Sequence, residues 1–336
     1  MPNVELLDAL EQLSLDSAFI KLQGKSKATL ASIPMSTSVD EANTLMSELQ
    51  GTTTFASHQT RTIPDEPVIK IRPGSFWESI DFAELWGHRD VLYFLMWRDL
   101  KVRYKQTVLG AGWVVFQPVL MTVVFAVFLG KLIRVPSDGI PYPLFAYSGL
   151  LLWTFVSNAV LSSCYSLVTN SQIITRIYFS RILIPTASVG VRLVDLVIAA
   201  ALLVPLIFYY HVPLSLTFLI LPLLLIQIAV LVLAVGILGA ALNVSYRDVG
   251  TLAPILLQVW MFVSPLVYSS SIVPPRLRLL YAVNPLVGII DGFRAALFSL
   301  PLPWTSIAVS ALVTFALLIF SIGVFRKLES SFADDI

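Results

Sequence analysis

Nearly uncharged apolar runs follow one another from about residue 111 to residue 325. Each is close to the roughly 20 residues that a helix needs to cross the hydrocarbon core of a bilayer. Six runs have this character, at about 111–131, 143–164, 187–210, 216–242, 251–268 and 304–325. The pattern therefore predicts an all-α integral membrane protein with six transmembrane helices.

One further apolar stretch, 272–300, differs from these runs. It contains residues that break or bend helices, namely Pro274, Pro275, Pro285 and Gly288. It also contains charged residues, namely Arg276, Arg278, Asp291 and Arg294. Non-helical backbone is tolerated at membrane depth only where protein or water surrounds it. We therefore expect two short helices that enter the membrane and return, a re-entrant helical hairpin between the fifth and sixth spans.

The chain before the spans divides into two parts. Residues 1–66 are rich in Ser, Thr and other small residues, so they bury too little apolar surface to offset the entropy of ordering. We expect a largely flexible cytoplasmic extension there. Residues 67–110 are rich in Trp and basic residues, and Asp81 and Glu84 have the spacing of a capping box. The later part of this segment places basic residues on one helix face beside a tryptophan: Trp97, Arg98, Lys101 and Lys105.

Such a helix before the first span is typical of the cytoplasmic membrane interface. An ordinary soluble helix that packs on the extension is the alternative. We therefore interpret 67–110 as a cytoplasmic amphipathic interfacial helix region.

The composition and charge agree with a membrane protein. Hydrophobic residues make up 57% of the 336 residues and charged residues 13%, whereas soluble domains have about 25% charged residues. The mean hydropathy is +0.82. Residues 1–110 hold 25 of the 43 charged residues, so the remainder is strongly depleted. The net charge of +1 leaves no basic excess for phosphates, and we expect no nucleic-acid partner.

Lys and Arg residues near the ends of the spans indicate the orientation. With the N-terminus inside, nine lie on the inner side: Arg98, Lys101, Arg103, Lys105, Arg176, Arg181, Arg247, Arg326 and Lys327. Five lie on the outer side: Lys131, Arg134, Arg276, Arg278 and Arg294. We therefore expect both termini in the cytoplasm, with 111–325 as the transmembrane domain and 326–336 as a cytoplasmic tail.

Residues suited to catalysis, metal binding or nucleotide binding are sparse. Cys164 is the single cysteine, and the three histidines are far apart, so we expect no metal site. The triplet at 24–26, Gly-Lys-Ser, lacks the preceding Gly of a phosphate loop, because Phe19 stands at that position. Beyond residue 110 and before the tail, the four acidic residues fall one to a region. We therefore expect no catalytic residue and no cofactor bound by this chain.

Short motifs in order along the chain carry a family resemblance. They are WRDLKVRYK at 97–105, then QTVLGAGW and Gln117-Pro118, PYPLFAYSGLLLW at 141–153, NSQIITRIYFSRILIP at 170–185, NVSYRD at 243–248, SPLVY at 264–268, Asn284-Pro285-Leu286, Gly292-Phe293-Arg294 and the terminal FADDI. From about residue 67 onward, the chain resembles ABC type-2 permeases that export O-antigen, capsule or teichoic-acid chains.

This resemblance implies half of a transporter. Two copies of the chain would form the membrane pathway, in a bacterial inner (plasma) membrane. A separate ABC ATPase subunit, carrying ATP and Mg²⁺, would drive it. The implied substrate is a lipid-linked polysaccharide, and membrane lipid surrounds the assembly. An exporter of a drug or small lipid is an alternative, and a membrane enzyme that acts on polyprenyl phosphate is a more distant one.

By the same resemblance, residues 165–185 hold the helix that couples the permease to the ATPase. Ile173, Ile174 and Ile177 would form an apolar knob, with Arg176 and Arg181 facing a soluble partner. The alternative is a connector whose arginines anchor to lipid headgroups. Arg247 and Asp248 follow the fourth span; they either transmit motion of the ATPase or form a capped turn at the membrane surface.

Two pairs of residues are candidates for the conduit lining. Arg192 and Asp195 have i, i+3 spacing in the third span, where they either line a polar path or neutralise each other within the packing. Trp260 and Tyr268 flank Ser264-Pro265 in the fifth span. Aromatic rings of this kind stack on sugar rings, but they are also ordinary lipid-facing and interfacial residues.

Overall fold

The computed structural model describes residues 87–105, 110, 112–174, 179–213, 215–329 and 332. The predicted flexible extension at 1–66, the capping box of Asp81 and Glu84, and the coupling candidates Arg176 and Ile177 lie outside these residues. Throughout the described part of the chain, the regular elements are helices, as the apolar runs predict.

Within the described residues, five helical stretches are long and apolar enough to cross a membrane. α5 (Gly112–Phe125) continues into η1 (Ala126–Ile133), α8 (Leu183–Ala200) is followed by α9 (Leu203–Tyr209), and η2 (Leu216–Ile220) precedes α10 (Leu221–Ser245). The other two are α6 (Tyr142–Thr169) and α14 (Trp304–Glu329). Each coincides with one of the predicted runs.

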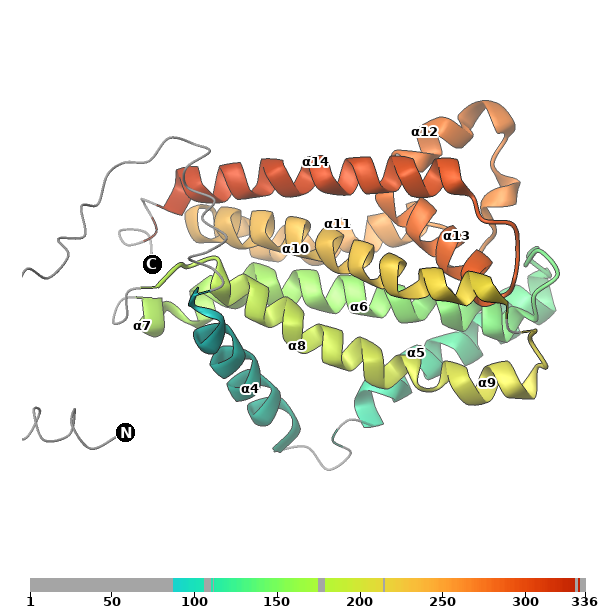
Figure 1. Ribbon diagram of the computed structural model, residues 1–336, viewed down its shortest axis with the longest axis horizontal. Coiled ribbons are helices and arrows are strands. Elements are labelled where there is room, and N and C mark those ends of the chain that lie inside the picture. The colour runs from blue at the N-terminus through green and yellow to red at the C-terminus, as the bar shows by residue number, and fades with distance from the viewer. Residues whose placement is uncertain are drawn as a thin grey trace, which may run out of the picture. The chain divides into compact units, whose positions relative to one another are not determined.

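The core lies around α6 and α10. α10 packs against both α6 and α14, and α6 also packs against α8 (Figure 1). Leu224, Ile228 and Leu231 of α10 are fully buried. A methyl group at Gly236 would lie 2.6 Å from Ser163 Oγ, so the absent side chain lets α10 approach α6 closely.

The segment between α10 and α14 is built from shorter helices. α11 (Asp248–Val263) has 16 residues, which is about 24 Å of helix, and it ends just before Pro265. It is followed by η3 (Ser270–Ile272), η4 (Pro275–Leu277), α12 (Arg278–Ala282) and α13 (Pro285–Leu297). Asn284 caps α13, because its side chain accepts a hydrogen bond from the Leu286 N–H at 3.2 Å.

Charged and connecting segments gather at the two ends of the helices. The short helix α7 (Ser171–Ile174) and the C-terminal end of α14 lie at one end, whereas α9 and α12 lie at the other (Figure 1). α4 (Arg89–Lys105) packs obliquely against α8 near the first end. Its Leu95 joins an apolar cluster that includes Ile174, Phe179, Phe325 and Phe332. We call this the inner cluster.

Candidate functional site

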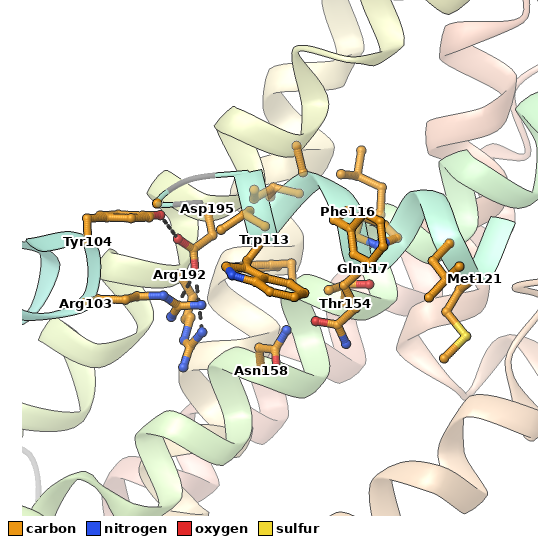
Figure 2. Close-up of a pocket in the computed structure, with 18 residues that line it drawn as sticks. Arg103, Tyr104, Trp113, Phe116, Gln117, Met121, Thr154, Asn158, Arg192 and Asp195 are labelled. Carbon is orange, nitrogen blue, oxygen red and sulfur yellow. Dashed lines mark hydrogen bonds and ion pairs between the residues drawn. The ribbon is translucent and has the colours of Figure 1, made fainter. Parts of the chain in front are cut away.

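A cavity of about 420 Å³ lies where the end of α4 meets α5, α6 and α8. Trp113, Phe116 and Met121 of α5 give it an apolar wall (Figure 2). Its polar lining comes from the other helices and from α5 itself: Arg103, Tyr104, Gln117, Thr154, Asn158, Arg192 and Asp195. We call it the α5 cavity.

Asp195 connects three helices at the edge of the α5 cavity. Its carboxylate accepts a hydrogen bond from the Tyr104 hydroxyl of α4. It also pairs with Arg103 Nη1 at 3.1 Å and with Arg192 Nη1 at 3.4 Å. Arg192 in turn donates from Nε and Nη2 to Ser162 Oγ of α6, at 2.8 and 2.6 Å. The network therefore joins α4 to α8 and, through Ser162, to α6; Figure 2 shows its part around Asp195.

This network explains how charged residues are accommodated within an apolar helix. A single charged side chain in the middle of a span costs about 2.5–3.5 kcal/mol on insertion scales. Three donors to Asp195 offset much of that cost. Burial, and then the hydrogen bond to Asp195, raises the pKa of Tyr104 to about 12, so the phenol keeps its proton at physiological pH.

Sequence reasoning found the Arg192–Asp195 pair but missed Arg103 and Tyr104. The missed partners lie about 90 positions earlier in the chain. A signal was available, because an i, i+3 arginine occupies only part of a buried carboxylate and predicts a further donor. The spacing of residues around Asp195 does not indicate where in the chain that further donor lies.

A second cavity, of about 610 Å³, adjoins the first on the side of α7. Arg103 and Arg192 line both cavities. The second cavity is lined by several hydroxyl groups and one side-chain amide: Ser162, Tyr165, Ser166, Thr169, Asn170 and Ser188. We call it the hydroxyl cavity. Together the two cavities place apolar side chains of α5 and hydroxyl-bearing side chains of α6 and α8 around one pair of guanidinium groups.

The described coupling candidates lie at the end of the bundle that holds α7. Ile174 is buried in the inner cluster, and Ile173 packs against that cluster. Arg181 donates from Nη1 to the carbonyl oxygen of Glu329 at 2.6 Å, which ties this segment to the end of α14. Arg247 and Asp248 are exposed at the start of α11.

The basic residues of α4 have different surroundings. Lys101 and Lys105 are exposed, and Trp97 is 54% exposed. Arg98 instead donates to Asn170 Oδ1 at 2.7 Å and pairs with Asp99 at 2.7 Å. Part of the predicted basic face is thus bound to the end of α6, and the remainder is exposed.

The aromatic candidates Trp260 and Tyr268 are half-buried near the α11–α13 junction. Trp260 donates from Nε1 to Asn284 Oδ1 at 2.9 Å and meets Trp153 edge to face. The Tyr268 hydroxyl lies 3.0 Å from that of Tyr281. Neither lines the α5 cavity, so the structure places the two predicted conduit pairs at separate sites.

Arg294 was counted among the outer basic residues, but its side chain is buried. Its guanidinium donates to the carbonyl oxygens of Pro265 at 2.6 Å, Leu266 at 2.5 Å and Phe145 at 3.2 Å. It also lies over the Phe145 ring, 3.6 Å from the ring centre. Arg294 therefore fixes the turn after α11 to α6 and α13. As a buried group, it does not contribute to the outer surface charge on which the orientation count relied.

Comparison with known proteins places this architecture in a family. A model of the ABC-2 type transporter family matches residues 90–298, which include α4 and extend through α13. An O-antigen export system permease protein, RfbA, from Klebsiella pneumoniae is 27% identical over 246 residues, covering 73% of this chain and 94% of the relative. RfbA from Myxococcus xanthus is 27% identical over 257 residues, covering 75% and 98%. The chain belongs to the ABC-2 type transporter family.

Proposed function

We propose that the chain is the membrane-spanning permease subunit of an ATP-driven exporter of a lipid-linked polysaccharide. The observation that carries this proposal is the alignment with the O-antigen export permeases over almost their whole length. The helices long enough to cross a membrane are consistent with it. The inner membrane of a bacterium is the location where such a subunit would act.

The proposed topology has six crossings and cytoplasmic termini. α11, extended by residues 264–268, is the fifth crossing, and the segment from η3 through α13 is the re-entrant hairpin. In support, α11 starts at the end of the bundle that holds α7, and α12 lies at the opposite end. Arg181, Arg247 and Arg326 lie at the end with α7, which is therefore the proposed cytoplasmic side.

A separate ATPase would supply the energy and hold ATP and Mg²⁺. The proposed dock is residues 165–185 with Arg247 and Asp248, assisted by α4. Two copies of the chain would enclose the path, because six spans are few for a passage that admits a sugar chain. Cyclic two-fold dimers are the commonest closed arrangement of identical chains.

An exporter of a drug or small lipid is the second candidate. One observation favours it: the α5 cavity, at about 420 Å³, has the size of a site for a small molecule. A polysaccharide exporter would need a wider path than this cavity, formed between two copies of the chain.

The proposal is tested by deleting the gene and restoring it on a plasmid. Loss of surface polysaccharide, with its lipid-linked precursor accumulating inside, is the expected result. Co-purification of an ATPase with the tagged chain tests the partner. Unchanged surface polysaccharide after deletion, or ATP hydrolysis by the purified chain alone, would contradict the proposal.

A further inference from the structure

Two guanidinium groups share one carboxylate where the α5 cavity meets the hydroxyl cavity. Arg103 and Arg192 both pair with Asp195 Oδ2. Among the described residues that line either cavity, the other charged side chains are Arg98 and Asp99, which pair with each other at 2.7 Å. The junction therefore has one positive charge in excess, held beside the apolar wall of the α5 cavity.

Guanidinium groups suit oxyanions, among them carboxylates and phosphates. Their planar, fixed donors match the oxygens of a phosphate, and two arginines can grip the same group. Asp195 accepts from three donors, and Ser162 Oγ holds Arg192 independently of Asp195. The excess charge is thus pre-oriented rather than carried on freely moving side chains.

The two cavities differ in a way that selects the remainder of the ligand. The α5 cavity presents Trp113, Phe116 and Met121, which suit a hydrocarbon chain. The hydroxyl cavity presents hydroxyl oxygens of Tyr165, Ser166 and Thr169, which donate to backbone carbonyls and can still accept hydrogen bonds from sugar hydroxyls. An anion at the arginine pair would therefore have an apolar continuation on one side and a polar continuation on the other.

We propose that Arg103 and Arg192 bind the phosphate or diphosphate that joins the exported glycan to its lipid. The lipid chain lies along α5, and the first sugars lie in the hydroxyl cavity. This inference rests on the proposed function and adds to it the part of the substrate that is recognised. Tyr104 is a positioning residue, because it acts on the arginines through Asp195, and the Asp195 carboxylate competes with the ligand for both guanidinium groups.

The test uses the full chain in phosphatidylcholine nanodiscs, with a polyprenyl diphosphate as the probe and native mass spectrometry and tryptophan fluorescence as readouts. Arg103→Gln should weaken binding by about ten- to hundred-fold, the loss expected for a charge-assisted hydrogen bond. Arg103→Lys, which keeps the charge, should recover part of it. Arg89→Gln makes the same change near the start of α4, away from both cavities, and serves as the matched control.

Asp195→Asn gives the sharpest prediction, because it should raise the affinity for the probe whereas Arg103→Gln should lower it. It removes the competing carboxylate while Asn can still accept from Tyr104, so the probe should bind more tightly. A purely structural role for the network predicts weaker binding in every variant. Thermal unfolding of each variant is measured first, so that folded proteins are compared.

Three results would overturn the site. They are equal binding by Arg103→Gln and Arg89→Gln, no gain from Asp195→Asn, and binding of inorganic pyrophosphate or phosphatidylglycerol as tight as that of the probe. Export is measured separately in cells. If the wild-type chain restores surface polysaccharide but Arg103→Gln binds the probe as tightly as wild type, only this site is rejected. If the wild-type chain restores nothing, the proposed function is rejected and the binding comparison still stands.

Discussion

At the scale of residues, charged side chains within the bundle join neighbouring helices through hydrogen bonds and ion pairs. Asp195 joins α4 to α8, and through Arg192 to α6. Arg294 joins the turn after α11 to α6. Local spacing predicted the Arg192–Asp195 pair, since both residues lie on one helix. The contacts to Tyr104 and from Arg294 to Phe145 depend on how distant helices pack, and periodicity in one segment carries no information about that.

Tyr104→Phe should reveal the strength of the Asp195 network. It removes one hydrogen bond to a carboxylate that keeps two arginines, so we expect a loss of about 1–3 kcal/mol in the free energy of unfolding. Thermal unfolding in detergent measures it. Tyr93→Phe is the control, because Tyr93 is on the same helix and 67% exposed. Equal melting temperatures for the two variants would contradict the assignment.

The difference in melting temperature between wild type and Tyr104→Phe should decrease at high pH. The pKa of Tyr104 in the folded chain is about 12, above the ordinary tyrosine value of about 10. Its stabilising contribution is therefore complete below about pH 10 and is lost as the pH rises through about 12. The difference in melting temperature between wild type and Tyr104→Phe should be constant from about pH 7 to 9 and shrink above that range.

Arg294→Ala should severely destabilise the turn after α11. It removes the donor to the carbonyl oxygens of Pro265 and Leu266, and each orphaned group costs about 1–3 kcal/mol, whereas the Phe145 carbonyl keeps the hydrogen bond from the Ser148 hydroxyl. We expect little folded protein in size-exclusion chromatography. Arg294→Lys keeps the charge but not the fork of donors, so its yield should be intermediate. Wild-type yield from the alanine variant would show that the turn is held by other contacts.

At the scale of elements, hydropathy predicted the positions of the long helices well. The predicted bounds differ from the structure where prolines end a helix. The run at 216–242 corresponds to η2 and α10, and the run at 304–325 to α14. The predicted run at 251–268 shifts to Asp248–Val263, because Pro265 cannot extend the helix and the chain turns there. The number of short helices in 272–300 was underestimated for the same reason, since each proline ends or starts a turn.

Two glycines of α10 should respond differently to the same substitution. A methyl group at Gly236 would lie 2.6 Å from Ser163 Oγ, whereas at Gly239 the nearest atoms of Cys164 are 3.5 Å away, an ordinary contact. Replacing helical glycine by alanine stabilises by up to about 1 kcal/mol where space exists. Gly239→Ala should therefore melt at or above the wild-type temperature and Gly236→Ala below it. The reverse order would mean that α6 and α10 are not packed as described.

At the scale of the whole molecule, the orientation and number of crossings decide which surfaces meet the ATPase. Six crossings put residue 276 outside and residue 247 inside, because α11 lies between them. Both side chains are exposed, and the native Cys164 is buried. The count of basic residues predicted this arrangement, but one outer residue, Arg294, is buried and does not contribute to it.

Cysteine labelling tests this topology directly. In intact spheroplasts, an impermeant maleimide should label Arg276→Cys and should label Arg247→Cys only after permeabilisation. Wild type, with Cys164 alone, is the control for background labelling. Labelling of both positions from the same side would mean that α11 does not cross, and the six-span topology would be wrong.

The inner cluster has a consequence for the way the protein is made. Leu95 of α4 and Phe332 belong to the same buried cluster, although almost the whole bundle lies between them in the chain. During translation, N-terminal segments emerge and fold before C-terminal ones. The cluster around α4 therefore cannot close until the ribosome has passed Phe332, after every membrane helix has been synthesised. Assembly of this end of the bundle is thus a late event, which follows the synthesis of α14.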